Sequence, residues 1–356
     1  KVVPIVKLKV PYCLCSSIES RHMITPVQGI LLFTLMVLSW LLSSSDRALN
    51  NILRKMRLIT VGLLHMLLSK DKKSKLEYDP SQVELDSDSV SKRLILIRHG
   101  ESEWNEVFNR GFDISFIFRL ISALVREVIM LSTRDSVFFD SPLSDTGIRQ
   151  AQELVRFMEK PTNDQKLDEI ISVLNGEKPE SSIIVTSNLR RAVATGLLSL
   201  WDRLTKTREP YYVVSCLQEM TFNVDGVSLL ERKEAPNERV GKELGFDVRY
   251  DSQFNYGTKS LQSNGSKRMG EFCDWLFTRK EKTIICNGHS LYFKEFFRKY
   301  LPLGLDHEAK RNKIVNCGVV SLVLQKGKIK NKIGYKIDPE SITVVYGGFE
   351  KKKRKH

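Results

Sequence analysis

Two histidines stand directly after short apolar runs in this sequence of 356 residues. His99 lies in the stretch LILIRHGESEWN at 94–105, and His289 lies in TIICNGHS. Short runs of β-branched and aliphatic residues are typical of strands buried on both faces of an α/β sheet. Ligands of such sheets bind at the carboxyl ends of the strands. We therefore expect the two imidazoles to meet at one edge of the sheet.

Charged side chains follow two further apolar runs. Arg190 and Arg191 come after IIVTSNL, at the expected first turn of a helix, and YYVVSCLQEM carries Glu219. A helix N-terminus favours anions, so arginines at this place predict an anionic ligand. Guanidinium groups offer planar donors that suit phosphate, and Arg98 adds another directly before His99. The set predicts a site where one imidazole attacks phosphorus and Glu219 protonates the leaving oxygen.

The elements that must position these residues alternate between strand-like and helix-like patterns. Candidate strands are 93–98, 182–186, 211–216, 282–286 and 318–324. Candidate helices are 145–159, 190–206, 265–279 and 290–300. Alternation at this spacing predicts an α/β fold with a mostly parallel sheet flanked by helices.

Composition describes an ordinary globular protein, with 42% hydrophobic and 9% aromatic residues. The net charge of +14 is partly concentrated in the terminal EKKKRKH at 350–356. Such a basic tail fits a solvated end, a nuclear-import signal or contact with an anionic surface. No basic stretch interleaved with aromatic residues and no zinc-finger spacing occurs, so we expect no nucleic acid partner. The six cysteines form no Cys-x-x-Cys pair, and we expect free thiols and neither a metal nor a cofactor.

The N-terminal part has a different character. Residues 23–42 contain no charged side chain and are long enough to cross a bilayer, which fits a membrane anchor, a cleaved signal peptide or a buried segment. Residues 46–70 fit a basic amphipathic helix that lies on a membrane or packs on the core. The predicted division is a helical segment 1–69, a linker 70–92, a catalytic domain 93–349 and a basic tail 350–356. We expect membrane contact through residues 23–70, with the catalytic domain in the cytoplasm.

With these motifs, the sequence resembles the histidine phosphatase superfamily, in its phosphoglycerate mutase-like branch. The run DSPLSDTGIRQAQEL at 140–154 matches a Pro-Leu-(Ser/Thr)-x-x-Gly-x-x-Gln-Ala pattern of that family. The resemblance covers roughly 93–325 and implies a twisted sheet of the α/β kind described above. It also implies roles for particular residues. His99 would become phosphohistidine and Glu219 would donate the proton, while Arg98, Arg191, His289, Ser102, Asn105 and Ser290 would bind the phosphorylated substrate.

Three functions are compatible with this resemblance. The expected one is a phosphomonoesterase that works through a phosphohistidine. A phosphoglycerate mutase is an alternative, but the stretch QEMTFNVDGVSLLERKE around Glu219 differs from that of the glycolytic mutases. A catalytically silent scaffold on the same fold is another, although every motif residue is present. The sequence does not identify the substrate, and the segment 106–139 fits a lid, a membrane-contacting helix or a packing element.

Overall fold

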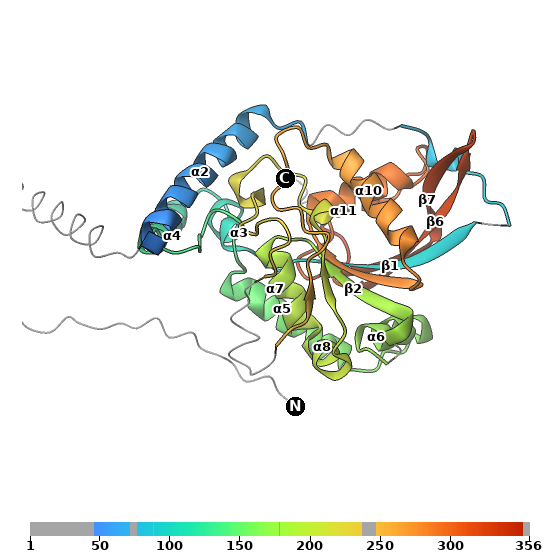
Figure 1. Cartoon of the computed structure of the whole chain (residues 1–356). Helices are drawn as coiled ribbons and strands as arrows, with labels where there is room; N and C mark the ends of the chain where they lie inside the picture. Colours follow the sequence, from blue (N-terminus) through green and yellow to red (C-terminus); the bar gives the residue numbers. More distant parts are fainter. Residues whose placement is uncertain (1–45, 72–76, 88, 178, 237–246, 352–356) are drawn as a thin grey trace, which may run out of the picture. The chain divides into compact units, whose positions relative to one another are not determined.

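The computed structural model describes residues 46–71, 77–87, 89–177, 179–236 and 247–351. Residues 50–356 belong to one compact unit. Its centre is a seven-stranded sheet in the order β4-β3-β2-β5-β1-β6-β7 (Figure 1). The strands are β1 (Val90–Arg98), β2 (Ser182–Thr186), β3 (Tyr211–Val213), β4 (Tyr250–Asp251), β5 (Thr283–Gly288), β6 (Val319–Ile329) and β7 (Lys332–Tyr346).

The sheet is mixed, with a parallel half that carries the predicted strand ends. Strands β4, β3, β2, β5 and β1 pair in parallel with one another, whereas β6 pairs antiparallel with β1 and with β7. Each expected strand is found at its place in the chain, although the one expected at 211–216 ends at Val213 and is followed by the 3-10 turn η3 (Ser215–Leu217). The parallel half agrees with the predicted α/β class. The strand expected at 318–324 belongs to the antiparallel part and continues to Ile329.

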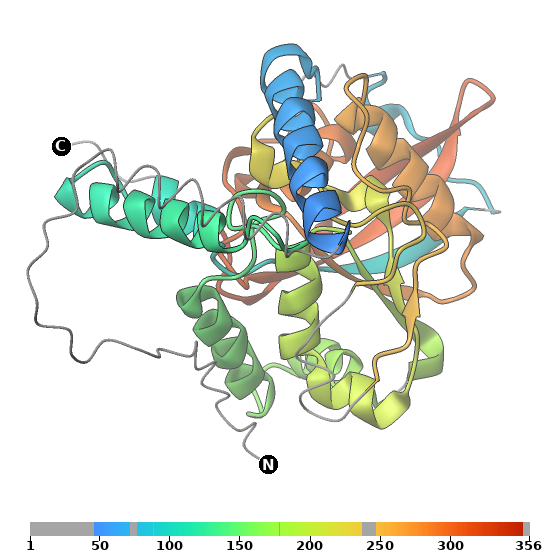
Figure 2. The ribbon, with the colours of Figure 1, turned by 60° about the vertical axis from the view of Figure 1, so that its left-hand side comes forward.

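Helices cover both faces of this sheet. On one face, α10 (Gly265–Thr278) and α11 (Ser290–Tyr300) bury Phe272 and Phe296 in a core with apolar residues of β1, β5 and β6. On the other face, α5 (Asp145–Met158), α6 (Gln165–Leu174), α7 (Arg190–Ser199) and α8 (Trp201–Thr207) form a second core. Figures 1 and 2 show these two groups on opposite sides of the strands. The helix expected at 190–206 is thus divided at Leu200 into α7 and α8.

Strand β7 is the longest of the elements that sequence reasoning missed; β4 and α6 were also missed. Strand β7 contains Asp338, Pro339 and Glu340, which interrupt the apolar alternation that marks a strand. Proline lacks a backbone N–H and is tolerated at the edge of a sheet, where one side of the strand has no partner. The pairing of β6 with β7 also shifts register between Ser321 and Val323.

The remaining elements are shorter or lie at the sides of the sheet. They are α2 (Asp46–Leu68), α3 (Glu103–Phe108), α4 (Ile114–Ile129), α12 (Glu308–Arg311) and the 3-10 turns η1 (Pro80–Gln82), η2 (Pro179–Ser181), η3 (Ser215–Leu217) and η4 (Val224–Gly226). Leu217 of η3 and Ala309 of α12 belong to the first core. Helix α4 occupies about half of the segment 106–139. Asp113 caps this helix, because its side chain accepts a hydrogen bond from the Phe116 N–H.

Much of the expected linker 70–92 is packed on the sheet unit. Asp71 and Val83 are buried, and the Tyr78 hydroxyl donates a hydrogen bond of 3.1 Å to the Tyr335 carbonyl of β7. Strand β1 already begins at Val90. The segment 70–92 is rich in serine and aspartate and was expected to serve only as a linker before the catalytic domain. It instead contributes several contacts to that domain.

The uncharged run 23–42 lies outside the described residues. Among the helices that the structure does describe, none combines the length and the apolar character that a membrane crossing needs.

Candidate active site

The two histidines meet at the carboxyl ends of neighbouring strands. Strands β1 and β5 are parallel and adjacent, and the His99 N–H donates a hydrogen bond of 3.0 Å to the Gly288 carbonyl. Each chain segment then turns at the end of its strand. The imidazole centroids of His99 and His289 lie 5.1 Å apart, and both rings are buried. The structure therefore places the two side chains together, as the strand pattern predicts.

One ring nitrogen of His99 makes a hydrogen bond to the backbone. Its Nδ1 lies 2.6 Å from the Gly100 carbonyl oxygen, which can only accept, so Nδ1 carries the hydrogen. The other nitrogen, Nε2, then has a free lone pair. Burial lowers the pKa of His99 well below its usual value, and the charges of Arg191 and Arg98 lower it further. The site thus holds a neutral imidazole that can act as a nucleophile.

His289 occupies the position just before α11. Among the described residues, neither of its ring nitrogens has a hydrogen-bond partner. Its pKa is also well below the usual value, first because of burial and then because of Arg191. A buried polar group without a partner is unfavourable unless a ligand or water supplies the bond. His289 is therefore available to bind a ligand between the two rings.

The loop after His99 is held by close backbone packing and two side-chain acceptors. A Cβ on Gly147 would lie 2.1 Å from the Glu101 carbonyl oxygen, so only glycine fits at this contact. Gln150 accepts the Glu101 N–H at 2.8 Å, and the Thr195 hydroxyl accepts the Gly100 N–H at 3.0 Å. Gly147 and Gln150 belong to the run 140–154. This run therefore shapes the loop that positions His99.

The two arginines at the start of α7 have different environments. The Arg191 side chain is 2% exposed, its Nη1 donates to the Asp225 carbonyl at 2.8 Å, and its Nη2 lies 3.3 Å from Asp225 Oδ2. Arg190 instead contacts Asp135 and donates through Nε to the Asp140 carbonyl at 2.8 Å. Arg191 also lowers the pKa of both His99 and His289, so its charge lies near the histidines, as expected. The expectation that Arg190 would share that site is wrong, because Arg190 binds carboxylate and carbonyl oxygens of the loop before α5.

Arg98 has a carboxylate partner from the end of the chain. Its Nη1 lies 2.5 Å from the Ile314 carbonyl and 2.6 Å from Glu350 Oε1. The Arg98 side chain is 7% exposed and that of Glu350 is 46% exposed. The Arg98 Nε has no partner among the described residues. Glu350, the first residue of the basic tail, therefore binds Arg98, which is one of the residues predicted to bind phosphate.

Glu219 lies between the histidines and the start of α11. Its Oε1 accepts the backbone N–H groups of Met220 and Tyr292, each at 3.0 Å. One donor atom each of His99, Glu219 and His289 falls within 4.8 Å of the others. These are also ligand types that zinc binds. The adjacent guanidinium groups of Arg98 and Arg191 repel a cation, so this site is better suited to an anion.

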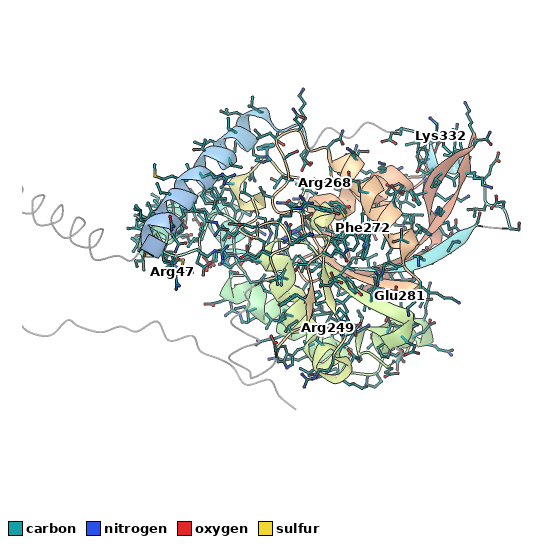
Figure 3. All side chains as sticks on the ribbon, viewed as in Figure 1. Arg47, Arg249, Arg268, Phe272, Glu281 and Lys332 are labelled. Carbon is teal, nitrogen blue, oxygen red and sulfur yellow. The ribbon has the colours of Figure 1, made fainter. Side chains whose placement is uncertain are left out.

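A buried ionic cluster holds the loop that carries Glu219. Lys259 Nζ donates to the Glu219 carbonyl at 2.7 Å and to Asp71 Oδ2 at 2.6 Å, and Arg268 Nη2 lies 2.7 Å from the same Asp71 oxygen. Arg268 projects from α10 (Figure 3). Burial lowers the pKa of Lys259 to about 8, against the effect of Asp71. No local pattern marked these residues, because Asp71 is far from Lys259 and Arg268 in sequence.

The other predicted ligands have local hydrogen bonds. Ser102 is buried, and its hydroxyl accepts the Asn105 N–H at 3.2 Å, which caps α3. The Asn105 Oδ1 accepts from Asn109 at 3.0 Å within the same helix segment. Ser290 is buried and begins α11 directly after His289. Ser290 therefore adjoins the site, whereas the described contacts of Ser102 and Asn105 stabilise the helix after His99.

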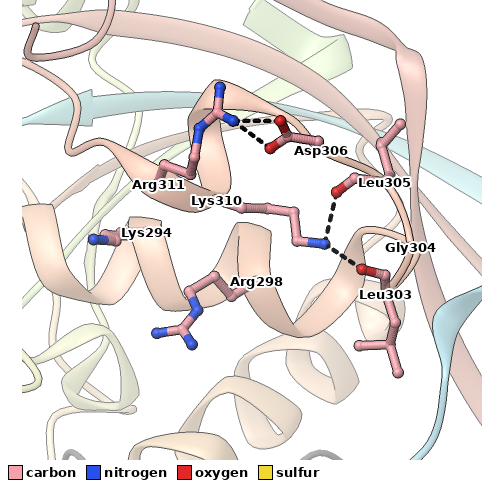
Figure 4. A pocket seen from close by; sticks show the side chains of 8 residues that line it. All are labelled: Lys294, Arg298, Leu303, Gly304, Leu305, Asp306, Lys310 and Arg311. Carbon is pink, nitrogen blue, oxygen red and sulfur yellow. Dashed lines mark hydrogen bonds and ion pairs between the residues drawn. The ribbon is translucent and has the colours of Figure 1, made fainter.

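An open pocket of about 450 Å³ lies elsewhere, toward the carboxyl end of α11 (Figure 4). Its basic residues are Lys294, Arg298, Lys310 and Arg311. Lys310 donates to the carbonyls of Leu303 and Leu305, and Arg311 contacts Asp306. His289 precedes the opposite end of this helix. The pocket therefore contains none of the residues predicted for chemistry.

No protein-family model and no curated protein matches the sequence. Solved structures do show similarity. A mycobacterial glucosyl-3-phosphoglycerate phosphatase is 17% identical with a TM-score of 0.36, over 69% of this chain and 97% of that one. A phosphoserine phosphatase of Entamoeba histolytica, in complex with phosphoserine, is 18% identical with a TM-score of 0.32, over 68% and 94%. These similar structures are members of the histidine phosphatase superfamily.

Proposed function

We propose that this protein is a phosphomonoesterase that works through a phosphohistidine at His99. The observation that carries the proposal is the state of this imidazole. Its Nδ1 is bound to the Gly100 carbonyl, its pKa is lowered, and its free Nε2 lies on a buried ring beside His289 and the arginines. A neutral imidazole in a cationic site has the right charge to attack a phosphate ester.

The proposed reaction has two steps. His99 Nε2 attacks phosphorus, and the bond from phosphorus to the ester oxygen breaks as Glu219 gives that oxygen a proton. Water then attacks the phosphohistidine, the carboxylate of Glu219 accepts a proton from the water, and the nitrogen–phosphorus bond breaks. The products are an alcohol and inorganic phosphate, and both side chains return to their starting states.

The phosphoryl oxygens would be bound by the arginines and by His289. Arg191 and Arg98 offer buried guanidinium donors, and the unpartnered nitrogens of His289 can supply another. Ser290 adjoins this group. Ser102 and Asn105 stay candidates for substrate contact if α3 rearranges on binding. This cluster of cations and neutral imidazoles stabilises the charge that develops on the transferred phosphoryl group.

A panel of phosphate esters tests the activity. The panel should contain phosphoserine and 3-phosphoglycerate, which are bound in solved structures of the similar phosphoserine phosphatase. The full chain should release phosphate from at least one ester and should carry acid-labile phosphate during turnover. Turnover without any labelled protein would reject the phosphohistidine. Transfer to an added acceptor alcohol in preference to water would favour the mutase alternative.

We also propose that residues 23–70 hold the chain at a membrane. The support is the uncharged run 23–42, followed by a leucine-rich segment in which Arg57 is exposed. Fractionation of cells with high-salt and carbonate washes tests the proposal. A membrane-bound chain is recovered with the membranes, and recovery of the full-length chain in the soluble fraction before any wash would reject it.

A further inference from the structure

Helix α2 packs on the rest of the unit through its less apolar face. Lys55 and His65 are buried there, with Lys55 Nζ 3.1 Å from Glu127 and His65 Nε2 3.1 Å from the Lys259 carbonyl. Gly62 lies so close to Val224 that a Cβ would approach within 2.8 Å. The opposite face of α2 is exposed and carries Leu53, Met56, Ile59, Leu63, Leu64, Met66, Leu67 and Leu68. Leu58 and Val61 also pack inward, on Phe139, Val227 and Leu229, so α2 carries apolar side chains on its exposed face as well as on its packed face.

Helix α4 has a second exposed apolar face. Ala123 packs inward with Val107 and Val137. The exposed apolar side chains of α4 and of the residues that flank it are Phe112, Ile114, Ile117, Phe118, Ile121, Leu124, Val125, Val128, Ile129 and Leu131. Phe118 is 69% exposed and Val128 is 71% exposed. Figure 2 shows α4 extending away from the neighbouring elements.

The two helices adjoin each other. Lys55 of α2 donates to the Met130 carbonyl at the end of α4 at 2.7 Å, and Asn51 donates to the Ser132 carbonyl at 2.8 Å. Together their exposed apolar residues make up most of the exposed large apolar side chains of the described chain. We call these residues the α2–α4 apolar surface. Large apolar surfaces of this kind mark sites of protein or membrane contact.

The charges near this surface favour a lipid partner. In α4, Glu127 pairs with Lys55, and Arg126 contacts Glu103, so the carboxylates are neutralised. Arg57 of α2 is exposed. In sequence, the uncharged run 23–42 ends just before α2, so the surface follows a segment with the composition of a bilayer anchor. Apolar side chains beside an exposed arginine suit the boundary between headgroups and acyl chains.

We propose that the α2–α4 apolar surface inserts into the interfacial layer of a membrane that contains anionic lipid. The inference rests on the proposed membrane association and adds which residues enter the lipid. Because the catalytic residues lie on the same unit, this contact fixes the unit against the bilayer. Two inserted helices bury more apolar area than a single interfacial helix and therefore hold more tightly.

Tryptophan quenching tests the insertion residue by residue. The full chain with Trp40→Phe receives one added tryptophan, by Phe118→Trp in α4, by Leu67→Trp in α2, or by Ile333→Trp in β7 as a matched exposed control. Each variant is mixed with vesicles of equal parts brominated phosphatidylcholine and phosphatidylserine. We expect more than half of the added fluorescence to be lost at positions 118 and 67, and little loss at position 333.

The pattern of quenching distinguishes insertion of the α2–α4 apolar surface from the membrane association of residues 23–70 on which this inference rests. If the variants co-sediment with vesicles but positions 118 and 67 are quenched no more than position 333, the surface is not inserted, and the membrane association stands. Quenching at only one of the two positions also overturns the inference, which requires both helices. If the variants fail to co-sediment at all, both proposals fail.

A charge-insertion variant gives an independent measurement. The double substitution Phe118→Glu/Ile121→Glu changes exposed residues, so folding should be unaffected, and we expect vesicle affinity to fall at least tenfold. The control Leu303→Glu, at another exposed leucine, should bind as the parent does. Unchanged affinity in the double variant overturns the inference. A parent dimer that the double variant abolishes, together with unchanged affinity, would assign the surface to a second copy of this chain.

Discussion

The carboxylate of Glu350 lies 2.6 Å from the guanidinium of Arg98, next to the nucleophilic candidate His99. A phosphate ester would have to share Arg98 with this carboxylate or displace it. The Glu350 side chain is nearly half exposed, so water can solvate its carboxylate when a phosphate takes its place at Arg98. The start of the C-terminal tail therefore competes with an anionic substrate for one of its ligands.

Replacing Glu350 by glutamine should strengthen binding of inorganic phosphate several-fold, because the neutral amide competes less well for Arg98. The inhibition constant of phosphate measures the change. Glu340→Gln, at an exposed position of β7, is the matched control. An unchanged inhibition constant in Glu350→Gln would show that Arg98 does not contact the phosphoryl group.

His99→Ala should abolish phosphate release and the acid-labile protein phosphate, since the other buried imidazole of the site, His289, is proposed to bind the phosphoryl oxygens and not to attack phosphorus. His307→Asn is the control, because His307 caps α12 far from the site in sequence and asparagine can also cap a helix. Near-normal turnover in His99→Ala would remove the nucleophile assignment.

Glu219→Gln should slow hydrolysis of alkyl phosphates much more than that of nitrophenyl phosphate. An alkoxide needs a proton as it leaves, whereas nitrophenolate barely does, and an amide cannot donate one efficiently. The ratio of kcat/KM for the two substrates is the readout. Equal losses would indicate that Glu219 acts structurally, through its bonds to Met220 and Tyr292 at the start of α11.

Asp71→Asn should destabilise the protein by about 3–5 kcal/mol, because it leaves Lys259 and Arg268 buried without their carboxylate. Urea unfolding measures the loss. Glu271→Gln, which breaks an exposed pair with Lys267, should cost about 0–1 kcal/mol. A truncated chain that begins at residue 93 would lose Asp71 as well, so activity should be measured on the full chain. Equal stability of the two variants would contradict a supporting role of the cluster.

Stability should fall as the pH is lowered below about 6.5, the usual pKa of histidine. Burial lowers the pKa values of His99 and His289 well below this value in the folded state. Between the folded and unfolded pKa values, the unfolded state binds more protons, so the free energy of unfolding rises with pH. Each residue contributes up to about 1.4 kcal/mol per pH unit. Urea titrations at several pH values should show a shallower slope for His289→Asn, and an unaltered slope would contradict the prediction.

The sequence alone determined the strands that end in the site and most of the helices between them. Strand 182–186 and helix 290–300 have the predicted bounds. Their signals are local, because apolar runs and helical spacing reflect which face of each element is buried. The convergence of His99 and His289 was also predictable, since parallel strands bring their carboxyl ends to one edge of a sheet.

Tertiary structure decided the partners that come from distant parts of the chain. Arg190 and Arg191 are adjacent and identical in type, yet Asp135 holds one and Asp225 the other. Asp71, in a segment with the composition of a linker, becomes the buried counterion of Lys259. Ion pairs of this kind depend on distances in the folded chain, and no local periodicity carries that information. The apolar face of α4 could be recognised in the sequence, but only the fold showed that it is turned outward.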